Sequence, residues 1–189
     1  MKLDVPYKQL STIPYDIIDN LVFNISENDW YISDYRNNAT NMGNTNSIPI
    51  QHTKKCLGGE PGSAIRNIKK EVLYDKYFPL IEPILDHLKQ HYSYHTYTAF
   101  LARLDSKSEI GMHRDGNGPF LSLCHRIHVP IITNPDVKYV IDDVEYYWEK
   151  GNVYEFDNMR VHGVINRSEE YRVHLVINLY SLETVQLFS

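Results

Sequence analysis

The sequence has few cysteines, no long apolar run and no excess of basic residues. Its two cysteines, Cys56 and Cys124, are far apart and match no metal-binding spacing. We therefore expect a reduced cytosolic protein, with a single disulfide as the alternative. The net charge at pH 7 is −5, whereas a nucleic-acid-binding protein normally presents a basic patch. Nucleic acid is thus not an expected partner.

The sequence also lacks features that direct a chain to a membrane. No apolar run approaches the roughly 20 residues that a membrane-spanning helix requires. The opening Met-Lys-Leu-Asp-Val-Pro-Tyr contains no apolar signal core. These absences favour a cytoplasmic protein without a membrane partner. Because no internal repeat is visible, we expect residues 1–189 to form a single domain, and the oligomeric state stays open.

Residues 1–95 are expected to support the rest of the chain with helices and loops. Apolar residues recur at helical spacing from Ile13 to Ile25, which predicts an amphipathic helix. A second helical region spans residues 71–92. It contains Pro79 and Pro83, and proline removes a backbone donor inside a helix. We therefore expect two short helices or a bend there.

The segment from Asp34 to Ser63 is polar and rich in turn-forming residues. It contains Gly58-Gly59 and Pro61-Gly62, and only a short strand, Ser47 to Ile50, interrupts it. A long polar loop in a compact domain is either disordered or functional. The sequence makes this segment a candidate lid or substrate loop.

Residues 96–180 have the pattern of consecutive strands and are expected to form the catalytic core. Helices followed by a run of strands favour a mainly β protein with flanking helices, such as a β-sandwich or jelly roll, because a parallel α/β fold would alternate the two. The expected strands are Tyr97–Leu104, Arg126–Ile132, Val137–Ile141, Glu145–Trp148, Asn152–Phe156, Val161–Asn166 and Arg172–Tyr180.

Two of these strands carry polar side chains on one face. Strand side chains alternate, so Arg172 and His174 share a face opposite an aliphatic row, and Arg126 and His128 repeat the pattern. One interpretation is a sheet with one wet side. The other is that both polar rows line a barrel interior and await an anion, since a buried arginine needs one. A turn near Arg167 would pair the last two strands and set His162 beside Arg172.

The set His113, Asp115 and His162 has the composition of an iron site. Two histidines and one carboxylate on one face of Fe(II) leave three positions open, which suits a bidentate 2-oxo acid and dioxygen. A lone His-x-Asp is weak evidence, but the set continues to Arg172, about ten residues after the second histidine. The guanidinium of Arg172 fits a distal carboxylate, so a five-carbon 2-oxo diacid is a natural cosubstrate.

These stretches resemble the aspartyl/asparaginyl β-hydroxylase family of Fe(II)/2-oxoglutarate dioxygenases, close to its small proline-hydroxylase-like members. The similarity covers roughly Tyr97 to Leu179, with a weaker echo at Asn46–Ile50. It runs through His113-Arg-Asp115, Arg126-Ile-His-Val-Pro130, Trp148-Glu-Lys-Gly151, Tyr154-Glu-Phe-Asp-Asn158, His162 and Arg172-Val-His-Leu175. The resemblance implies a double-stranded β-helix, that is, a cupin-like jelly roll.

The resemblance also implies roles for individual residues. It makes His113, Asp115 and His162 the ligands of Fe(II), and it makes Arg172, Arg126 and His128 the contacts of 2-oxoglutarate. The expected substrate contacts are Arg126, Tyr97, Arg103 and Asn117. Asp157 and His174 are expected to orient the metal ligands without binding the metal themselves.

The function that these expectations support is hydroxylation of an amino acid side chain. The substrate would be a free amino acid or a peptide or protein residue such as Asp, Asn or Pro, and O2 and 2-oxoglutarate would be consumed with release of succinate and CO2. Two alternatives remain at the level of sequence. One is a non-catalytic metal-binding cupin or sensor module, and the other is a cupin oxygenase that does not use 2-oxoglutarate.

Overall fold

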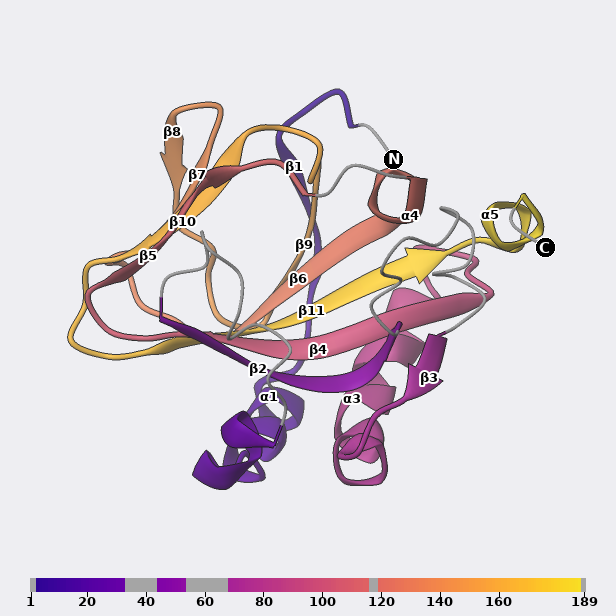
Figure 1. Cartoon of the computed structure of the whole chain (residues 1–189), viewed down its shortest axis with the longest axis horizontal. Helices are drawn as coiled ribbons and strands as arrows, with labels where there is room; N and C mark the ends of the chain where they lie inside the picture. The colour runs from indigo at the N-terminus through magenta and orange to yellow at the C-terminus, as the bar shows by residue number, and fades with distance from the viewer. Residues whose placement is uncertain (1–2, 33–43, 54–67, 116–118, 188–189) are drawn as a thin grey trace.

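Two antiparallel β-sheets face each other, and helices cover the outer face of the larger one (Figure 1). The computed structural model describes residues 3–32, 44–53, 68–115 and 119–187. Its strands are β1 (Tyr7–Thr12), β2 (Thr45–Thr53), β3 (Ile68–Lys70), β4 (Thr96–Leu104), β5 (Ser108–His113), β6 (His125–Ile132), β7 (Val137–Ile141), β8 (Val144–Tyr146), β9 (Asn152–Phe156), β10 (His162–Asn166) and β11 (Arg172–Tyr180). Its helices are α1 (Tyr15–Phe23), η1 (Glu27–Tyr31), α3 (Tyr74–Leu88), α4 (Pro119–Ser122) and α5 (Leu182–Gln186).

The strand order is that of a jelly roll. The larger sheet, sheet A, has the order β1-β9-β6-β11-β4-β2-β3, and the smaller one, sheet B, has the order β5-β10-β7-β8. From β4 to β11 the chain crosses between the sheets at each step, except at the β7–β8 hairpin. Asp142 and Asp143 turn that hairpin with positive φ values of 49° and 65°, as a type I′ turn requires. The predicted mainly β fold with flanking helices, a double-stranded β-helix, is confirmed.

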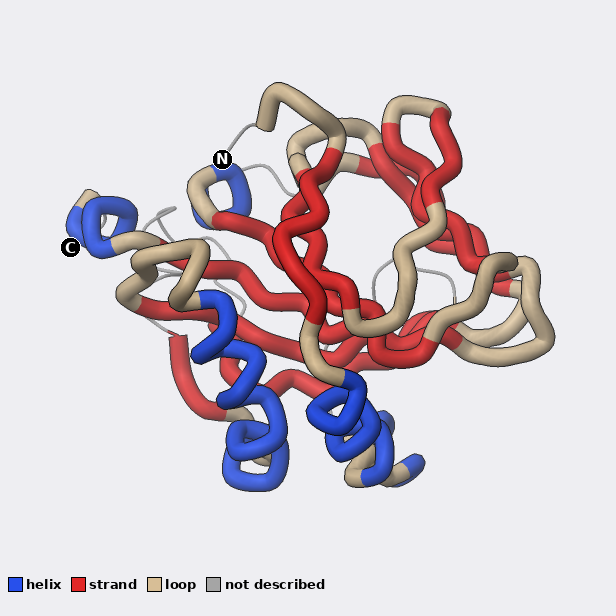
Figure 2. The backbone as a smooth tube through the Cα atoms, turned by 180° about the vertical axis from the view of Figure 1, so that it is seen from behind, coloured by secondary structure: helices blue, strands red, loops and turns tan. Residues whose placement is uncertain are grey.

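The main apolar core lies between sheet A and the helices. Figures 1 and 2 show α1 and α3 next to each other against one face of this sheet. The aliphatic row of β11, Val173, Leu175, Ile177 and Leu179, is fully buried in this core. Because β11 is the central strand of sheet A, this row fixes which face of the sheet meets the helices. The opposite row, with Arg172 and His174, must then face sheet B.

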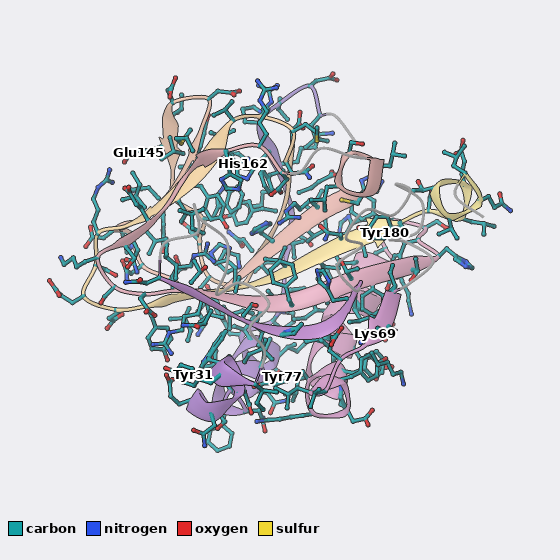
Figure 3. All side chains as sticks on the ribbon, viewed as in Figure 1. Tyr31, Lys69, Tyr77, Glu145, His162 and Tyr180 are labelled. Carbon is teal, nitrogen blue, oxygen red and sulfur yellow. The ribbon has the colours of Figure 1, made fainter. Side chains whose placement is uncertain are left out.

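A second core, rich in aromatic rings, fills the space between the two sheets. Trp148 stacks on Tyr139 at 3.9 Å and on Tyr154 at 4.9 Å between ring centroids. Phe156 and Ile141 belong to the same cluster. Figure 3 shows His162 among the side chains enclosed by the sheets, whereas Tyr77 lies on the helix side of sheet A. The polar rows of β6 and β11 therefore face an enclosed interior, and the alternative of a wet sheet face is wrong.

The predicted helices are present with one correction. The first is α1, shorter than the periodic stretch from Ile13 to Ile25. The second, α3, is one helix that contains both Pro79 and Pro83, not two short ones. It persists because its buried face, which includes Tyr77, Ile81 and Ile84, packs on sheet A, and such packing outweighs the missing backbone donors. No helix of the described residues is long and apolar enough to cross a membrane.

Sheet A contains more of the N-terminal half than the sequence pattern predicted. The strand expected at Ser47–Ile50 is the nine-residue β2, which pairs with β4 and β3. The remainder of the candidate lid, apart from Asn44 to Thr53, lies outside the described residues, as does Asn117. Strand β5, which ends at His113, was not predicted because its sequence, Ser-Glu-Ile-Gly-Met-His, is short and weakly alternating.

The last two strands do not form the hairpin that was expected. Strand β10 pairs with β5 and β7 in sheet B, whereas β11 pairs with β4 and β6 in sheet A. The chain between them crosses from one sheet to the other, so His162 and Arg172 are not neighbours on paired strands. They face the same interior from opposite sheets, and the prediction of a shared cavity holds for a different reason.

The short helix η1 is fastened to α3 by a buried carboxylate. Asp29 accepts hydrogen bonds from Lys76 Nζ and Tyr77 Oη, both at 2.5 Å, and from the backbone N–H of Ser26 at 3.3 Å. Burial by itself raises the pKa of Asp29, but the hydrogen bonds from Lys76 and Tyr77 outweigh it and leave the pKa lowered.

We expect Asp29→Asn to lower the free energy of unfolding by about 1–3 kcal/mol, because it weakens a charged hydrogen bond at a buried site. Since the folded pKa lies below the unfolded one, this contribution is present above about pH 4 and is lost as pH falls through the folded pKa. Urea denaturation from pH 3 to pH 7 measures both effects. Asp86→Asn, which breaks the exposed Asp86–Lys89 pair, is the control and should change stability by less than about 0.5 kcal/mol. An equal loss in both variants would contradict the assignment.

Candidate active site

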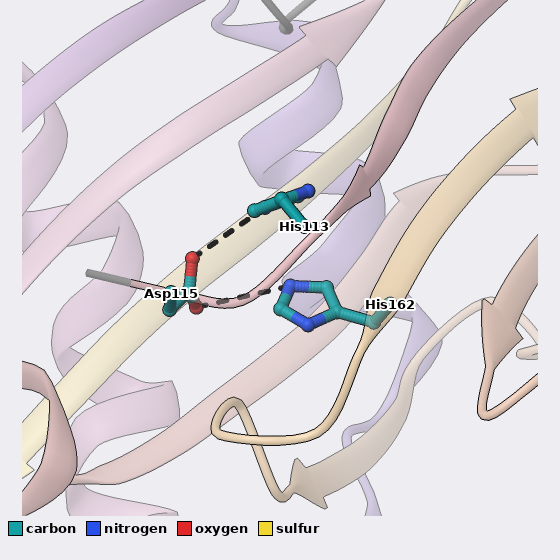
Figure 4. A group of neighbouring side chains, drawn as sticks. All are labelled: His113, Asp115 and His162. Carbon is teal, nitrogen blue, oxygen red and sulfur yellow. Dashed lines mark ion pairs between the residues drawn. The ribbon is translucent and has the colours of Figure 1, made fainter. Parts of the chain in front are cut away.

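Three potential metal ligands meet where β5 and β10 pair (Figure 4). His113 ends β5 and stands directly opposite His162, the first residue of β10. Asp115 follows two residues after His113 and turns back to both rings. Its Oδ1 lies 3.7 Å from His113 Nε2, and its Oδ2 lies 3.9 Å from His162 Nε2. One ligand atom from each residue lies within 4.8 Å of the others, so the set can surround one ion.

A glycine allows the two strands to approach this closely. The β5–β10 register shifts between His162 and Val164. A Cβ at Gly163 would lie 2.7 Å from the carbonyl oxygen of Ile110 and 2.9 Å from Met112 Sδ. Only a residue without a side chain fits at this point, so Gly163 lets His162 stand against His113.

Backbone carbonyls orient both imidazoles. His113 Nδ1 lies 2.8 Å from the oxygen of Gly111, and His162 Nδ1 lies 2.9 Å from the oxygen of Arg160. A carbonyl oxygen only accepts hydrogen bonds, so each Nδ1 carries the hydrogen and each Nε2 keeps a lone pair. Metal-bound histidines are typically held in this way. The donor set of two imidazoles and one carboxylate therefore fits Fe(II).

The electrostatics of the site keep Asp115 ionised. Its burial by itself raises the carboxyl pKa, but the Arg126 guanidinium and the two histidines outweigh this and hold the pKa well below its usual range. Arg126 Nε lies 3.0 Å from Asp115 Oδ2. This contact is an ion pair whose geometry does not meet that of a hydrogen bond. The neighbouring Asp115 carboxylate raises the pKa of His113, and burial lowers that of His162.

A small cavity of about 40 Å³ extends from these three residues into the space between the sheets. Its polar lining comes from both sheets. Besides the three potential ligands, the lining includes Arg126, His128, Tyr139 and Arg172. The structure therefore brings together all the residues that were predicted to bind metal and 2-oxoglutarate.

Arg172 is buried in this cavity without an anionic partner. Its side chain is 2% exposed, and no carboxylate of the described residues lies within ion-pair distance. Nη1 donates to the carbonyl oxygen of Ala102 at 3.1 Å, while Nε has no hydrogen-bond partner. Burial lowers the pKa of Arg172. A buried guanidinium in this state is costly unless a ligand supplies the negative charge.

Two of the expected substrate contacts point away from the cavity. Tyr97 and Arg103 occupy the face of β4 that turns to the helices. Tyr97 packs against the helix-side core, and Arg103 forms ion pairs with Glu27 and Asp105. Neither residue lines this cavity, because the alternation of β4 directs Ala102 inward and its neighbour Arg103 outward.

Asp157 and His174, which were expected to orient the metal ligands, make different hydrogen bonds. Asp157 does not contact His162; its Oδ1 accepts from the N–H of Met159, and so it shapes the turn whose Arg160 carbonyl orients His162. His174 touches no metal ligand. Its Nδ1 lies 3.3 Å from the hydroxyl of Tyr139, which lines the cavity.

Three polar residues of the interior were not singled out from the sequence. Tyr139 lines the cavity, and Thr45 and Ser47 carry buried hydroxyl groups without hydrogen-bond partners. Ser47 stands beside Ala102 on the neighbouring strand, the residue whose carbonyl receives Arg172. The alternation of Ser47 with the core residues Ile48 and Ile50 could have placed this hydroxyl inward, but β2 was not recognised as part of the sheet.

A family model for aspartyl/asparaginyl beta-hydroxylase matches residues 69–181 of the chain, more than half of its length. The match includes each described residue of the cavity lining. No curated protein matches the chain.

Solved structures share the fold at low sequence identity. A prolyl-4-hydroxylase from Pseudomonas putida is 14% identical, with a TM-score of 0.59 and coverage of 94% of each chain. An oxidoreductase of the 2OG-Fe(II) oxygenase family from Burkholderia pseudomallei is 16% identical, with a TM-score of 0.60, and 93% of this chain and 84% of that chain are covered. A prolyl hydroxylase from Trichoplax adhaerens, solved with a peptide fragment of the hypoxia inducible factor oxygen degradation domain, is 11% identical. Its TM-score is 0.60, and 97% of this chain and 87% of that chain are covered.

We expect the protein to bind one divalent metal ion per chain and His162→Ala to weaken this binding at least a hundredfold, because it removes one of three ligands. Titration with Co(II), followed by its visible absorption, measures the affinity. Binding should weaken as pH falls through the raised pKa of His113, since a protonated imidazole cannot bind a metal. His91→Ala, at an exposed position after α3, is the matched control. Unchanged Co(II) affinity in His162→Ala would exclude this site.

Proposed function

The chain belongs to the aspartyl/asparaginyl β-hydroxylase family, and from this membership we propose how its residues divide the work of hydroxylation. It is a 2-oxoglutarate-dependent dioxygenase that uses Fe(II). When bound, Fe(II) supplies dioxygen activation coupled to oxidation of 2-oxoglutarate to succinate and CO2, and the second oxygen atom enters a C–H bond of the substrate. We propose that this bond belongs to an amino acid side chain.

In this proposal His113, Asp115 and His162 hold the metal and leave its other positions open toward the cavity. The Nδ1 contacts to backbone carbonyls keep both imidazoles in the tautomer that binds a metal. Arg126 balances the charge of Asp115 from the adjacent wall. It also donates to Asn178 Oδ1 at 3.2 Å, and this places its guanidinium between the metal site and the side of the cavity where a substrate carboxylate or amide can lie.

The observation that carries the cosubstrate assignment is the unpaired guanidinium of Arg172. A five-carbon 2-oxo diacid has one end that chelates a metal and another that is a carboxylate. The cavity offers a metal site on sheet B and a lone guanidinium on sheet A, so the two ends of such a molecule match the two walls. His128, whose Nε2 has no hydrogen-bond partner, supplies a further polar contact to 2-oxoglutarate.

The substrate enters the space that 2-oxoglutarate leaves. Two proteins with the same fold are prolyl hydroxylases, and one of them was solved with a peptide. We therefore propose Asp, Asn or Pro, free or within a peptide, as the substrate.

We expect Arg172→Ala to raise the dissociation constant of 2-oxoglutarate by about a hundredfold, the cost of a charged hydrogen-bonded contact. Anaerobic titration of the Fe(II)-loaded protein follows the weak visible band of an iron-bound 2-oxo acid. The control is Arg167→Ala, which removes an exposed arginine paired with Glu145 and should leave the affinity unchanged. If wild-type protein binds Fe(II) but gives no band, the 2-oxoglutarate assignment fails, and a sensor module or a different cupin oxygenase takes its place.

We expect succinate to form faster when the true substrate is present, with a product heavier by one oxygen atom. Succinate release and product mass are measured with free Asp, Asn and Pro and with short peptides that contain each of them. A matched panel of Ala in place of the tested residue gives the uncoupled background. Succinate formation that no amino acid or peptide stimulates would contradict the proposed substrate class while leaving the cosubstrate intact.

A further inference from the structure

Tyr139 spans the interior between the two sheets. It is a residue of β7 in sheet B, and its hydroxyl oxygen reaches two histidines of sheet A. The oxygen lies 2.9 Å from His128 Nδ1 and 3.3 Å from His174 Nδ1. His128 is on β6 and His174 is on the adjacent β11. One hydroxyl therefore contacts both imidazoles of the polar rows.

The ring of Tyr139 is held firmly enough to fix the position of its hydroxyl. One side stacks on Trp148 at 3.9 Å between centroids, with 19° between the planes. Trp148 in turn stacks on Tyr154. The Arg172 guanidinium lies 5.8 Å from the Tyr139 centroid. With its ring packed in this stack, Tyr139 places its hydroxyl oxygen between the two histidines.

Both histidines are neutral, so each has one N–H and one lone pair. Burial lowers the pKa of His128 and of His174 well below the usual value. In each ring Nδ1 contacts Tyr139 and Nε2 has no hydrogen-bond partner. If Nδ1 donates to the hydroxyl, Nε2 is an acceptor, and if Nδ1 accepts from the hydroxyl, Nε2 is a donor.

The distances favour one assignment of the hydrogens. A hydroxyl has a single hydrogen and can donate to only one of the two Nδ1 atoms. The 2.9 Å contact to His128 is the better hydrogen bond, and the 3.3 Å contact suits an N–H of His174 that points at the same oxygen. His128 then carries its hydrogen on Nε2, and His174 carries its hydrogen on Nδ1.

The charge of the expected ligand favours the same assignment. His128 lines the cavity, where an anion would meet either an N–H or a lone pair. Only the N–H attracts a carboxylate. His174 lies two residues from Arg172 on the same face of β11, and the positive charge of that guanidinium further lowers the pKa of His174.

We propose that Tyr139 is a positioning residue that fixes the tautomer of His128, so that His128 presents an Nε2–H to the carboxylate-bearing cosubstrate in the cavity. This inference rests on the proposed function, because it takes 2-oxoglutarate as the anion. It adds a residue of sheet B that controls a donor on sheet A without itself needing to touch the cosubstrate.

The test combines a direct reading of the tautomer with binding. Two-bond ¹H–¹⁵N spectra of the Zn(II)-loaded protein, which is diamagnetic, distinguish hydrogen on Nδ1 from hydrogen on Nε2 for each histidine. In wild type we expect His128 as the Nε2–H form and His174 as the Nδ1–H form. In Tyr139→Phe we expect His128 to populate both forms, and the dissociation constant of 2-oxoglutarate on the Fe(II) protein to rise about tenfold.

Two further variants separate positioning from general packing. His128→Gln places an amide where Nε2 stands and can donate without help from Tyr139, so adding Tyr139→Phe in this background should change 2-oxoglutarate affinity by less than about twofold. Tyr146→Phe removes a hydroxyl from the strand position opposite Tyr139 in sheet B, and it should alter neither the tautomer nor the affinity.

Three results bear on the proposal. A wild-type spectrum with His128 as the Nδ1–H form overturns it, and so does a tenfold loss of affinity that Tyr139→Phe produces equally in the His128→Gln background. Absence of 2-oxoglutarate binding in wild-type Fe(II) protein counts against the proposed function, and the tautomer spectra then still decide whether Tyr139 sets the state of His128.

Discussion

The buried carboxylate of Asp115 is the interaction on which the rest of the interior depends. A lone ionised carboxylate between two sheets would be very costly, and here Arg126 and two imidazoles surround it. These partners come from β5, β6 and β10, so one charge ties sheet A to sheet B. The same charge completes the group that can hold a metal ion. Structural and chemical roles therefore coincide at this residue.

The two interior arginines differ in how their charge is balanced. This difference determines which arginine is available to an anionic ligand. Arg126 has the carboxylate of Asp115 within 3.0 Å, and so its charge is largely committed to the protein. Arg172 has only a backbone carbonyl and an aromatic ring beside it. An incoming dianion finds its best unpaired positive charge at Arg172, which stands on the sheet opposite His113 and His162. The electrostatics thus set the direction in which a 2-oxo diacid can lie.

Packing of the helices against sheet A stabilises the fold enough to allow a polar interior on the other side of that sheet. Sheet A buries the aliphatic rows of β6 and β11 against α1 and α3, and its stability comes largely from that face. The other face is then available for arginine and histidine side chains, which an ordinary two-layer core would exclude. Aromatic stacking of Tyr139, Trp148 and Tyr154 closes the space between the sheets around these polar groups.

The sequence by itself determined the residue chemistry and most of the strands. The patterns of β7, β9 and β11 gave their limits as the structure has them, because strict alternation and turn residues are local signals. The inward row of Arg172 and His174 followed from the same alternation, whereas the set of His113, Asp115 and His162 followed from residue type and spacing. The spacing of Arg172 from these ligands pointed to a 2-oxo diacid, and the resemblance to a family identified it as 2-oxoglutarate.

Only the tertiary structure decided how these pieces meet. The sequence predicted that His162 and Arg172 would lie on paired strands, but the chain crosses between sheets after Asn166 and sets them on opposite walls. Local periodicity says which side of a strand a residue occupies, not which strand is its neighbour. For the same reason it could not show that Arg103 faces the helices, or that the hydroxyl of Tyr139 reaches His128 and His174. Such contacts depend on the pairing and packing of residues distant in the chain.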